Sequence, residues 1–297
     1  MIWTHDIHRA KTRPCKTSET GFGTNFYSVR SSTGEWYDGL DEWLRDVEDK
    51  AAAGYETLLG GNIPEGQQRA DFATFVSSLY VRSPSVIRAS AEGYGHFVQL
   101  LMNVEWGTRE RFERQIDKYE SENGRIKISR DELWEFHNDK TRYTIQVDQK
   151  RGLGIMSSSD TIQAILFSRN WHLVYPSEGY FISSDSPVYR FVPEGKDFGA
   201  YGDGGFANPA AEITLPLSPR ACLLITGTEL SSERVSLPGD SVRMLNEMRA
   251  ASADRFLYSH RSELLADLGS RFSQPGIRLE LDGGGPYADV EVLTRMR

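Results

Sequence analysis

The chain has 297 residues and a formal net charge of −8, which argues against broad, charge-driven binding to nucleic acid or anionic lipid, because phosphate recognition needs a concentrated positive field. Its length and a hydrophobic content of 39% are sufficient for a folded core. Its longest apolar run, 221–225, is far shorter than the roughly 20 residues that cross a bilayer.

The amino-terminal sequence and the cysteine content both favour a cytoplasmic location. The amino end, "MIWTHDIHRAK", lacks the basic start and the apolar stretch of about 7–15 residues that direct secretion. The two cysteines, Cys15 and Cys222, are far apart and form no CxxC pair. We therefore expect two ordinary thiols in a reducing compartment.

The first half of the chain predicts mainly helices. The first 37 residues are expected at an edge of the fold, and within them residues 25–37 read as two short extended pieces around a Ser-Gly turn. From residue 38 onward the apolar residues recur at the helical period of 3.6. The expected helices are 40–58, a helix after Pro64 that stops at Ser83, one that starts at Pro84, a charged helix face within 105–130, a short helix capped by Ser129 and Glu132, and 158–169. Residues 141–148 alternate as a strand does.

The second half predicts mainly strands. Four short runs bounded by Pro, Gly and Ser suggest two antiparallel hairpins: "WHLVY", "YFISS", "EITLPLS" and "ACLLITG". Residues 195–209 are expected to form a long exposed loop, a helix occupies about 240–260, and 277–296 reads as a last hairpin. No repeat or linker divides the sequence. We therefore expect one α+β domain over 1–297, in which a helix-rich part (38–170) packs on a small, mainly antiparallel sheet (171–297) to which the late helix returns.

Three segments of the second half carry a resemblance to a known family. "GYFISSDSPV", "ITLPLSPRACLLI" and "LNEMRAASADRFLYS" resemble the family catalogued as domain of unknown function 4238. Its members usually open with a His-containing segment, and this chain begins after the point where that segment would lie. The resemblance implies that a site depending on that histidine is incomplete here, and it implies no reaction.

The run "SSDSP" interrupts a strand-like stretch and offers two interpretations. Ser184, Asp185 and Ser186 can close a turn, since a serine or aspartate before a proline accepts hydrogen bonds from nearby backbone N–H groups. Alternatively, Asp185 projects into a cleft, where its carboxylate holds a metal ion or acts as a base.

Three further residues are candidates for the same site. Glu48 lies at the margin of the apolar face of the helix 40–58, a position that suits a polar pocket or a salt bridge. Arg82 either binds a phosphate or carboxylate, or pairs internally with Asp185. Asn246 lies in the middle of an apolar helix face and needs a hydrogen-bond partner, which we expect in the backbone at Ser184–Asp185.

These residues support two hypotheses of different kinds. One is a metal-dependent nuclease or hydrolase acting on a phosphate-containing substrate, with Glu48 and Asp185 as acids, Arg82 as the phosphate ligand and a divalent cation as cofactor. The other is a binding or structural module in which Arg82, Ser184 and Asn246 hold the helices on the sheet. The sequence has no phosphate loop, nucleophile elbow or HExxH motif. It favours the module, and leaves open whether the protein is an enzyme.

Overall fold

The computed structural model describes residues 1–17, 20, 39–142, 153–193 and 204–272, together with the backbone of 29–30 and 36–37. Its helices and two mainly antiparallel sheets confirm the predicted α+β class. Residues 143–148 of the strand expected at 141–148, and the hairpin expected at 277–296, lie outside the described residues. No helix in the described part is long and apolar enough to cross a membrane.

The larger sheet has five strands in the order β10-β5-β9-β8-β7. Its strands are β5 (Asn170–Pro176), β7 (Tyr189–Phe191), β8 (Glu212–Ser218), β9 (Ala221–Thr226) and β10 (Arg234–Leu237). β8 and β9 form the hairpin that the sequence predicted, with Ile213 opposite Ile225. β10 runs parallel to β5, and the other pairs are antiparallel.

The smaller sheet has four strands in the order β2-β1-β11-β6. Its strands are β1 (Ile2–Asp6), β2 (Lys11–Cys15), β6 (Ser183–Ser184) and β11 (Phe256–Ser259). The placement of the amino terminus at an edge was wrong, because β1 is an inner strand and Thr4, His5 and Asp6 are buried. The hairpin expected around the Ser-Gly turn is confirmed as β3 (Val29–Arg30) against β4 (Trp36–Tyr37).

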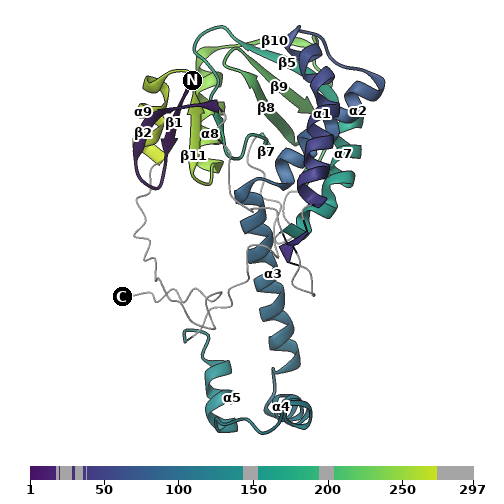
Figure 1. The fold of residues 1–297 in the computed structure, drawn as a ribbon, viewed down its shortest axis with the longest axis vertical. Coiled ribbons are helices and arrows are strands. Elements are labelled where there is room, and N and C mark those ends of the chain that lie inside the picture. Colours follow the sequence, from purple (N-terminus) through teal and green to yellow (C-terminus); the bar gives the residue numbers. More distant parts are fainter. Residues whose placement is uncertain are drawn as a thin grey trace.

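Helices cover both faces of the larger sheet (Figure 1). On one face lie α1 (Gly39–Leu59), α2 (Gly66–Val81) and α7 (Ser159–Ser168), preceded by the 3₁₀ turn η2 (Leu153–Ser158). On the other lies α8 (Gly239–Ser252), and α9 (Ser262–Phe272) packs on the smaller sheet. The alternation of strand side chains divides the core, so that Leu223 packs with α1, α2 and α7 and its neighbour Cys222 packs with α8.

A helical arm projects away from this body (Figure 1). It consists of α3 (Pro84–Glu105), α4 (Arg109–Asn123) and α5 (Arg130–Asn138), with α4 and α5 at its far end. The predicted capping of α5 is confirmed, because the Ser129 Oγ accepts a hydrogen bond from the backbone N–H of Glu132 at 3.1 Å. α3 starts at Pro84, which fixes φ for a first helical turn.

The late helix is shorter than predicted. α8 ends at Ser252, and Phe256–Ser259 form β11 in place of further helical turns. The reason is that the backbone N–H groups of 254–256 donate to the Asp185 side chain and not to the carbonyls four residues earlier. A second difference is that only Ser183 and Ser184 of the run "YFISS" belong to a strand, β6, which pairs with β11 and not with β5. The sequence analysis also missed α9.

Candidate ligand pocket beside the Asp185 corner

The residues from Ser184 to Pro187, here called the Asp185 corner, attach the loop after α8 to the strand segment before them. Asp185 Oδ1 accepts a hydrogen bond from the Asp254 N–H at 2.9 Å. Asp185 Oδ2 accepts from the N–H groups of Arg255 and Phe256, at 2.7 and 2.9 Å. Burial raises the pKa of Asp185, and the three amide hydrogen bonds oppose that rise. This carboxylate therefore acts on the backbone of its own chain.

The two serines close the corner. Ser184 Oγ donates to the carbonyl of Ser186 at 2.9 Å and accepts from its N–H at 3.2 Å. Ser186 Oγ shares a hydrogen bond of 2.7 Å with Ser85 Oγ, at the start of α3. Both Ser184 and Ser186 are buried. The corner has the turn-closing geometry that a Ser-Asp-Ser-Pro run favours, and it contacts the base of the arm.

Asn246 fixes α8 on the segment just before the corner. Its Oδ1 accepts from the Ile182 N–H at 3.1 Å, and its Nδ2 donates to the Tyr180 carbonyl at 2.8 Å. The partner is thus the backbone before β6, two to four residues earlier than expected. The buried Asn246 amide therefore provides hydrogen-bond partners for backbone groups that have no neighbouring strand at this point.

Arg82 and Glu48 form an ion pair with each other, with 2.8 Å between Arg82 Nη1 and Glu48 Oε1. The internal pair expected between Arg82 and Asp185 is replaced by this contact, because Arg82 is the cap residue at the end of α2, next to α1. Glu48 is half exposed. Within the described ranges, no group of three or more His, Cys, Asp or Glu side chains is placed to hold a metal ion.

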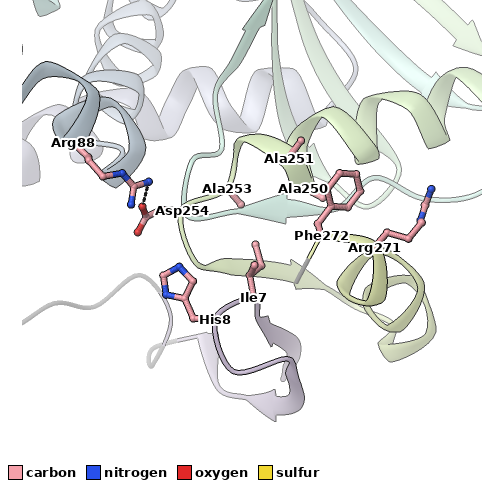
Figure 2. A pocket seen from close by; sticks show the side chains of 9 residues that line it. All are labelled: Ile7, His8, Arg88, Ala250, Ala251, Ala253, Asp254, Arg271 and Phe272. Atoms are coloured by element: carbon pink, nitrogen blue, oxygen red, sulfur yellow. Dashed lines mark ion pairs between the residues drawn. The ribbon is translucent and has the colours of Figure 1, made fainter. Parts of the chain in front are cut away.

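A pocket of about 400 Å³ is lined in part by the loop that Asp185 holds (Figure 2). Four parts of the chain line it: the turn after β1, α3, the end of α8 with the loop that follows, and the end of α9. The lining residues are Ile7, His8, Arg88, Ala250, Ala251, Ala253, Asp254, Arg271 and Phe272. Asp254 connects the pocket to the corner, since its N–H binds Asp185 and its side chain reaches the pocket.

The charged groups of the pocket are held by ion pairs. Arg88 Nη2 pairs with Asp254 Oδ1 across the gap between α3 and the loop (Figure 2). Arg271 pairs with Glu247 at 2.7 Å and with Asp267 at 3.0 Å. Two guanidinium groups and one carboxylate therefore border a cavity whose other lining residues include three alanines and Phe272.

The turn that carries His8 is fixed by Asp6. Its Oδ1 accepts hydrogen bonds from the N–H groups of His8 and Arg9, at 3.1 and 3.2 Å. Its Oδ2 pairs with Arg255 at 2.9 Å. Burial alone would raise the pKa of Asp6, but the hydrogen bonds and the charge of Arg255 lower it. The pocket wall is thus tied to the loop that Asp185 holds.

The residues that line this pocket, among them His8, Arg88, Asp254 and Arg271, were not predicted from the sequence. One signal was present: the alanine-rich end of the late helix, 250–253, followed directly by a charged pair. Small side chains where a helix ends leave space beside its last carbonyls.

Comparison with known proteins identifies a family and no closer relative. The family model described as "Protein of unknown function (DUF4238)" matches residues 1–263. No curated protein and no solved structure matches the chain. The matched range contains both sheets, the Asp185 corner and most of the pocket. The chain belongs to the DUF4238 family, as the segments around Asp185 and Asn246 indicated.

Proposed function

We propose that this chain is a binding module for a small molecule that carries both an anionic and a cationic group, such as a short peptide. One observation carries the proposal: a cavity of about 400 Å³, lined by four parts of the fold, in which basic and acidic side chains lie beside small and apolar ones. Cavities of roughly 300–1,000 Å³ with a few convergent polar groups are typical of small-molecule sites.

The anionic group of the ligand faces Arg271. A guanidinium has five N–H donors, and Arg271 donates to Glu247 and Asp267 through its two terminal nitrogens. A ligand carboxylate would join these pairs or displace one of them, at little cost because the paired groups are partly exposed. His8, on the turn after β1, lies on the side of the Arg88–Asp254 pair and away from Arg271 (Figure 2).

The cationic group of the ligand faces Asp254 and the end of α8. Ala250 and Ala251 belong to the last turn of this helix, where carbonyl groups lack partners within the helix and the macrodipole is negative. Asp254 adds a full negative charge two residues after the helix ends. The site therefore offers acceptors on one side and donors on the other.

The contacts that the carboxylates of Asp185 and Glu48 make favour binding over catalysis. The carboxylate of Asp185 accepts three backbone hydrogen bonds, and that of Glu48 pairs with Arg82. The alternative in which these two acids serve a metal-dependent nuclease or hydrolase remains a prediction, and it requires both carboxylates to leave these partners. Our proposal requires no such rearrangement.

The test is calorimetric and thermal-shift titration of the full chain with four probes: alanyl-alanine, acetate, ethylamine and inorganic phosphate. Only alanyl-alanine carries both charges, so we expect it to raise the melting temperature more than the other three. A ligand at 100 times its Kd stabilises the native state by about 2.7 kcal/mol.

Two variants and a control locate the binding. Arg271→Gln and Asp254→Asn should each weaken the response to alanyl-alanine, because each removes the partner of one ligand charge. Arg243→Gln is the matched control, since Arg243 also lies on an exposed helix face in a pair with an acid, Asp240, outside the pocket. An equal response to acetate alone, or an undiminished response in both pocket variants, would refute the proposal.

A further inference from the structure

The arm presents an apolar stripe on α3 that no part of the described chain covers well. Five of the fourteen exposed large hydrophobic residues in the described part fall within eleven residues of this helix. We call them the α3 stripe, and their exposed fractions are Tyr94 48%, Phe97 53%, Leu100 59%, Leu101 46% and Val104 54%. A contiguous cluster of exposed apolar side chains on a helix marks an interaction surface more often than scattered apolar residues do.

The spacing of the stripe is that of a helix–helix seam. Tyr94, Phe97, Leu101 and Val104 follow one another at intervals of three, four and three residues, which is the a/d pattern of a coiled coil. Leu100 widens the seam on one side. α3 has a second face, with Ala91 and Gly95, which is buried. The helix therefore carries one apolar face that its own chain uses and one that it leaves exposed.

We propose that the α3 stripe binds a second copy of this chain, with the two α3 helices antiparallel across a two-fold axis between Leu100 and Leu101. In this arrangement Phe97 of one copy lies against Val104 of the other, so that a large side chain meets a small one. The leucines of both copies fill the centre.

The area of the stripe fits a self-pairing. Five half-exposed side chains of this size offer on the order of 450 Å² per copy, and a two-fold contact buries the same patch on both copies. The total, about 900 Å² before flanking residues are added, lies below the roughly 1,200 Å² at which standard interfaces begin, so we expect a weak dimer with a Kd in the micromolar range.

The shape of the molecule permits this contact. The arm projects from the body, so α3 extends away from both sheets (Figure 1). The 22 residues of α3 extend about 33 Å at 1.5 Å per residue. In an antiparallel pair the two bodies therefore lie at opposite ends of the dimer.

A polar contact at the rim supports the antiparallel direction. On a helical wheel of 100° per residue, Tyr94 and Glu105 lie on the same side of the stripe. The two-fold axis then brings the Cα atom of Tyr94 in one copy to within about 3 Å, along the helix axis, of the Cα atom of Glu105 in the other. Glu105 accepts a hydrogen bond from Gln115 through Oε2 at 2.7 Å, and its carboxylate has capacity for a further donor.

Sedimentation velocity of the full chain tests the proposal, over concentrations from about 1 to about 200 µM, which bracket a micromolar Kd. The wild type should shift from monomer to dimer across this range. Leu101→Glu should weaken association by at least about tenfold, because it places two charges at the dimer axis. The matched control is Leu59→Glu, which changes a leucine of similar exposure, 49%, at the end of α1. It should dimerise as the wild type does.

Charge reversal separates loss of the interface from loss of the fold. Leu101→Glu mixed with Leu101→Lys should restore association, since the two charges then attract across the axis, and each variant should keep the melting temperature of the monomer. A wild type that stays monomeric throughout overturns the inference. So does a Leu101→Glu variant that still dimerises, because the contact would then lie elsewhere.

Discussion

The body and the arm use their charged side chains in different ways. In the body, Asp185 binds three backbone N–H groups, and Arg169 binds three backbone carbonyls: those of Phe206, Asn208 and Ala211, at 2.7, 2.5 and 2.5 Å. In the arm, Arg130 binds other side chains: the carboxylates of Glu113, Asp117 and Glu120, at 2.9, 2.8 and 2.5 Å.

The difference follows from how far each group is exposed to water. Loops that lie beside the sheets have backbone groups with no strand partner, and burying such a group without a hydrogen bond is costly. A buried charged side chain supplies several bonds at once, so Asp185 and Arg169 each fix a loop. In the arm, helices satisfy their own backbone and the ion pairs are exposed to water, where they contribute little. Asp185, Arg169 and Arg130 thus each make three contacts, but the contacts of the first two contribute more to the free energy of unfolding.

The largest effect should come from Asp185→Ala. The change leaves three N–H groups, those of Asp254, Arg255 and Phe256, without their acceptor, and the α8–β11 loop loses its anchor. Since each unsatisfied buried donor costs about 1–3 kcal/mol, we expect the free energy of unfolding to fall by roughly 4 kcal/mol, measured by chemical denaturation. A loss below about 1 kcal/mol would show that the corner does not hold the loop.

Asp185→Asn is the control, because it keeps nearly the same side-chain shape and removes the charge. The difference in stability between the wild type and this variant should also depend on pH. Because burial raises the pKa of Asp185 in the native state, the native protein binds this proton more tightly than the unfolded chain does. This tighter proton binding stabilises the native state by its full amount below the unfolded pKa of about 4, and the stabilisation is lost as pH rises through the native pKa. The stability of the wild type relative to Asp185→Asn should therefore decrease from pH 3.5 upward, to a plateau near neutral pH.

The second effect is that of Arg169→Ala, which releases three carbonyls between residues 206 and 211. We expect a loss of roughly 3 kcal/mol, less than for Asp185, because part of this loop can take hydrogen bonds from water. Hydrogen exchange should show faster opening near 205–211 first. Arg220→Ala is the matched control, since Arg220 is exposed and donates to the single carbonyl of Gly179 at 3.5 Å. It should leave stability nearly unchanged.

The sequence predicted the elements better than the contacts that join them. Periodicity identified α1, α2, α3 and the β8–β9 hairpin because their apolar residues follow one local repeat. It extended α8 too far because the signal that stops the helix, Asp185, lies almost seventy residues earlier. Asp185 and Asn246 were recognised as polar residues in apolar surroundings, whereas their partners are backbone groups that have no sequence signature. The pocket residues come from four separate parts of the chain, which no local pattern connects.

The third effect tests whether a buried charge in the body is needed at all. Arg249 is 1% exposed, donates to the Pro187 carbonyl at 3.2 Å and to Thr214 Oγ1 at 3.0 Å, and its Nε has no partner among the described residues. Burial raises the pKa of the adjacent Cys222 thiol to about 11, so that thiol does not neutralise the guanidinium at neutral pH. Arg249→Met should change stability by less than about 1.5 kcal/mol, because a side chain of similar length replaces a desolvated cation. A loss as large as that of Asp185→Ala would show that the two hydrogen bonds outweigh desolvation.

The smallest effect should come from Arg130→Ala, although this residue has more ionic partners than any of the body residues considered above. All of its partners are carboxylates of α4 that remain accessible to water, with side-chain exposed fractions of 29% for Glu113, 66% for Asp117 and 18% for Glu120, so water and salt screen them. We expect the urea midpoint to change little at low salt and not at all at about 1 M NaCl, where the Debye length is about 3 Å. The salt dependence is decisive because a buried network would keep its contribution. If Arg130→Ala destabilised the chain equally at both salt concentrations, the arm would hold its helices by packing of the arginine stem, and the contrast with Asp185 would rest on burial and not on charge.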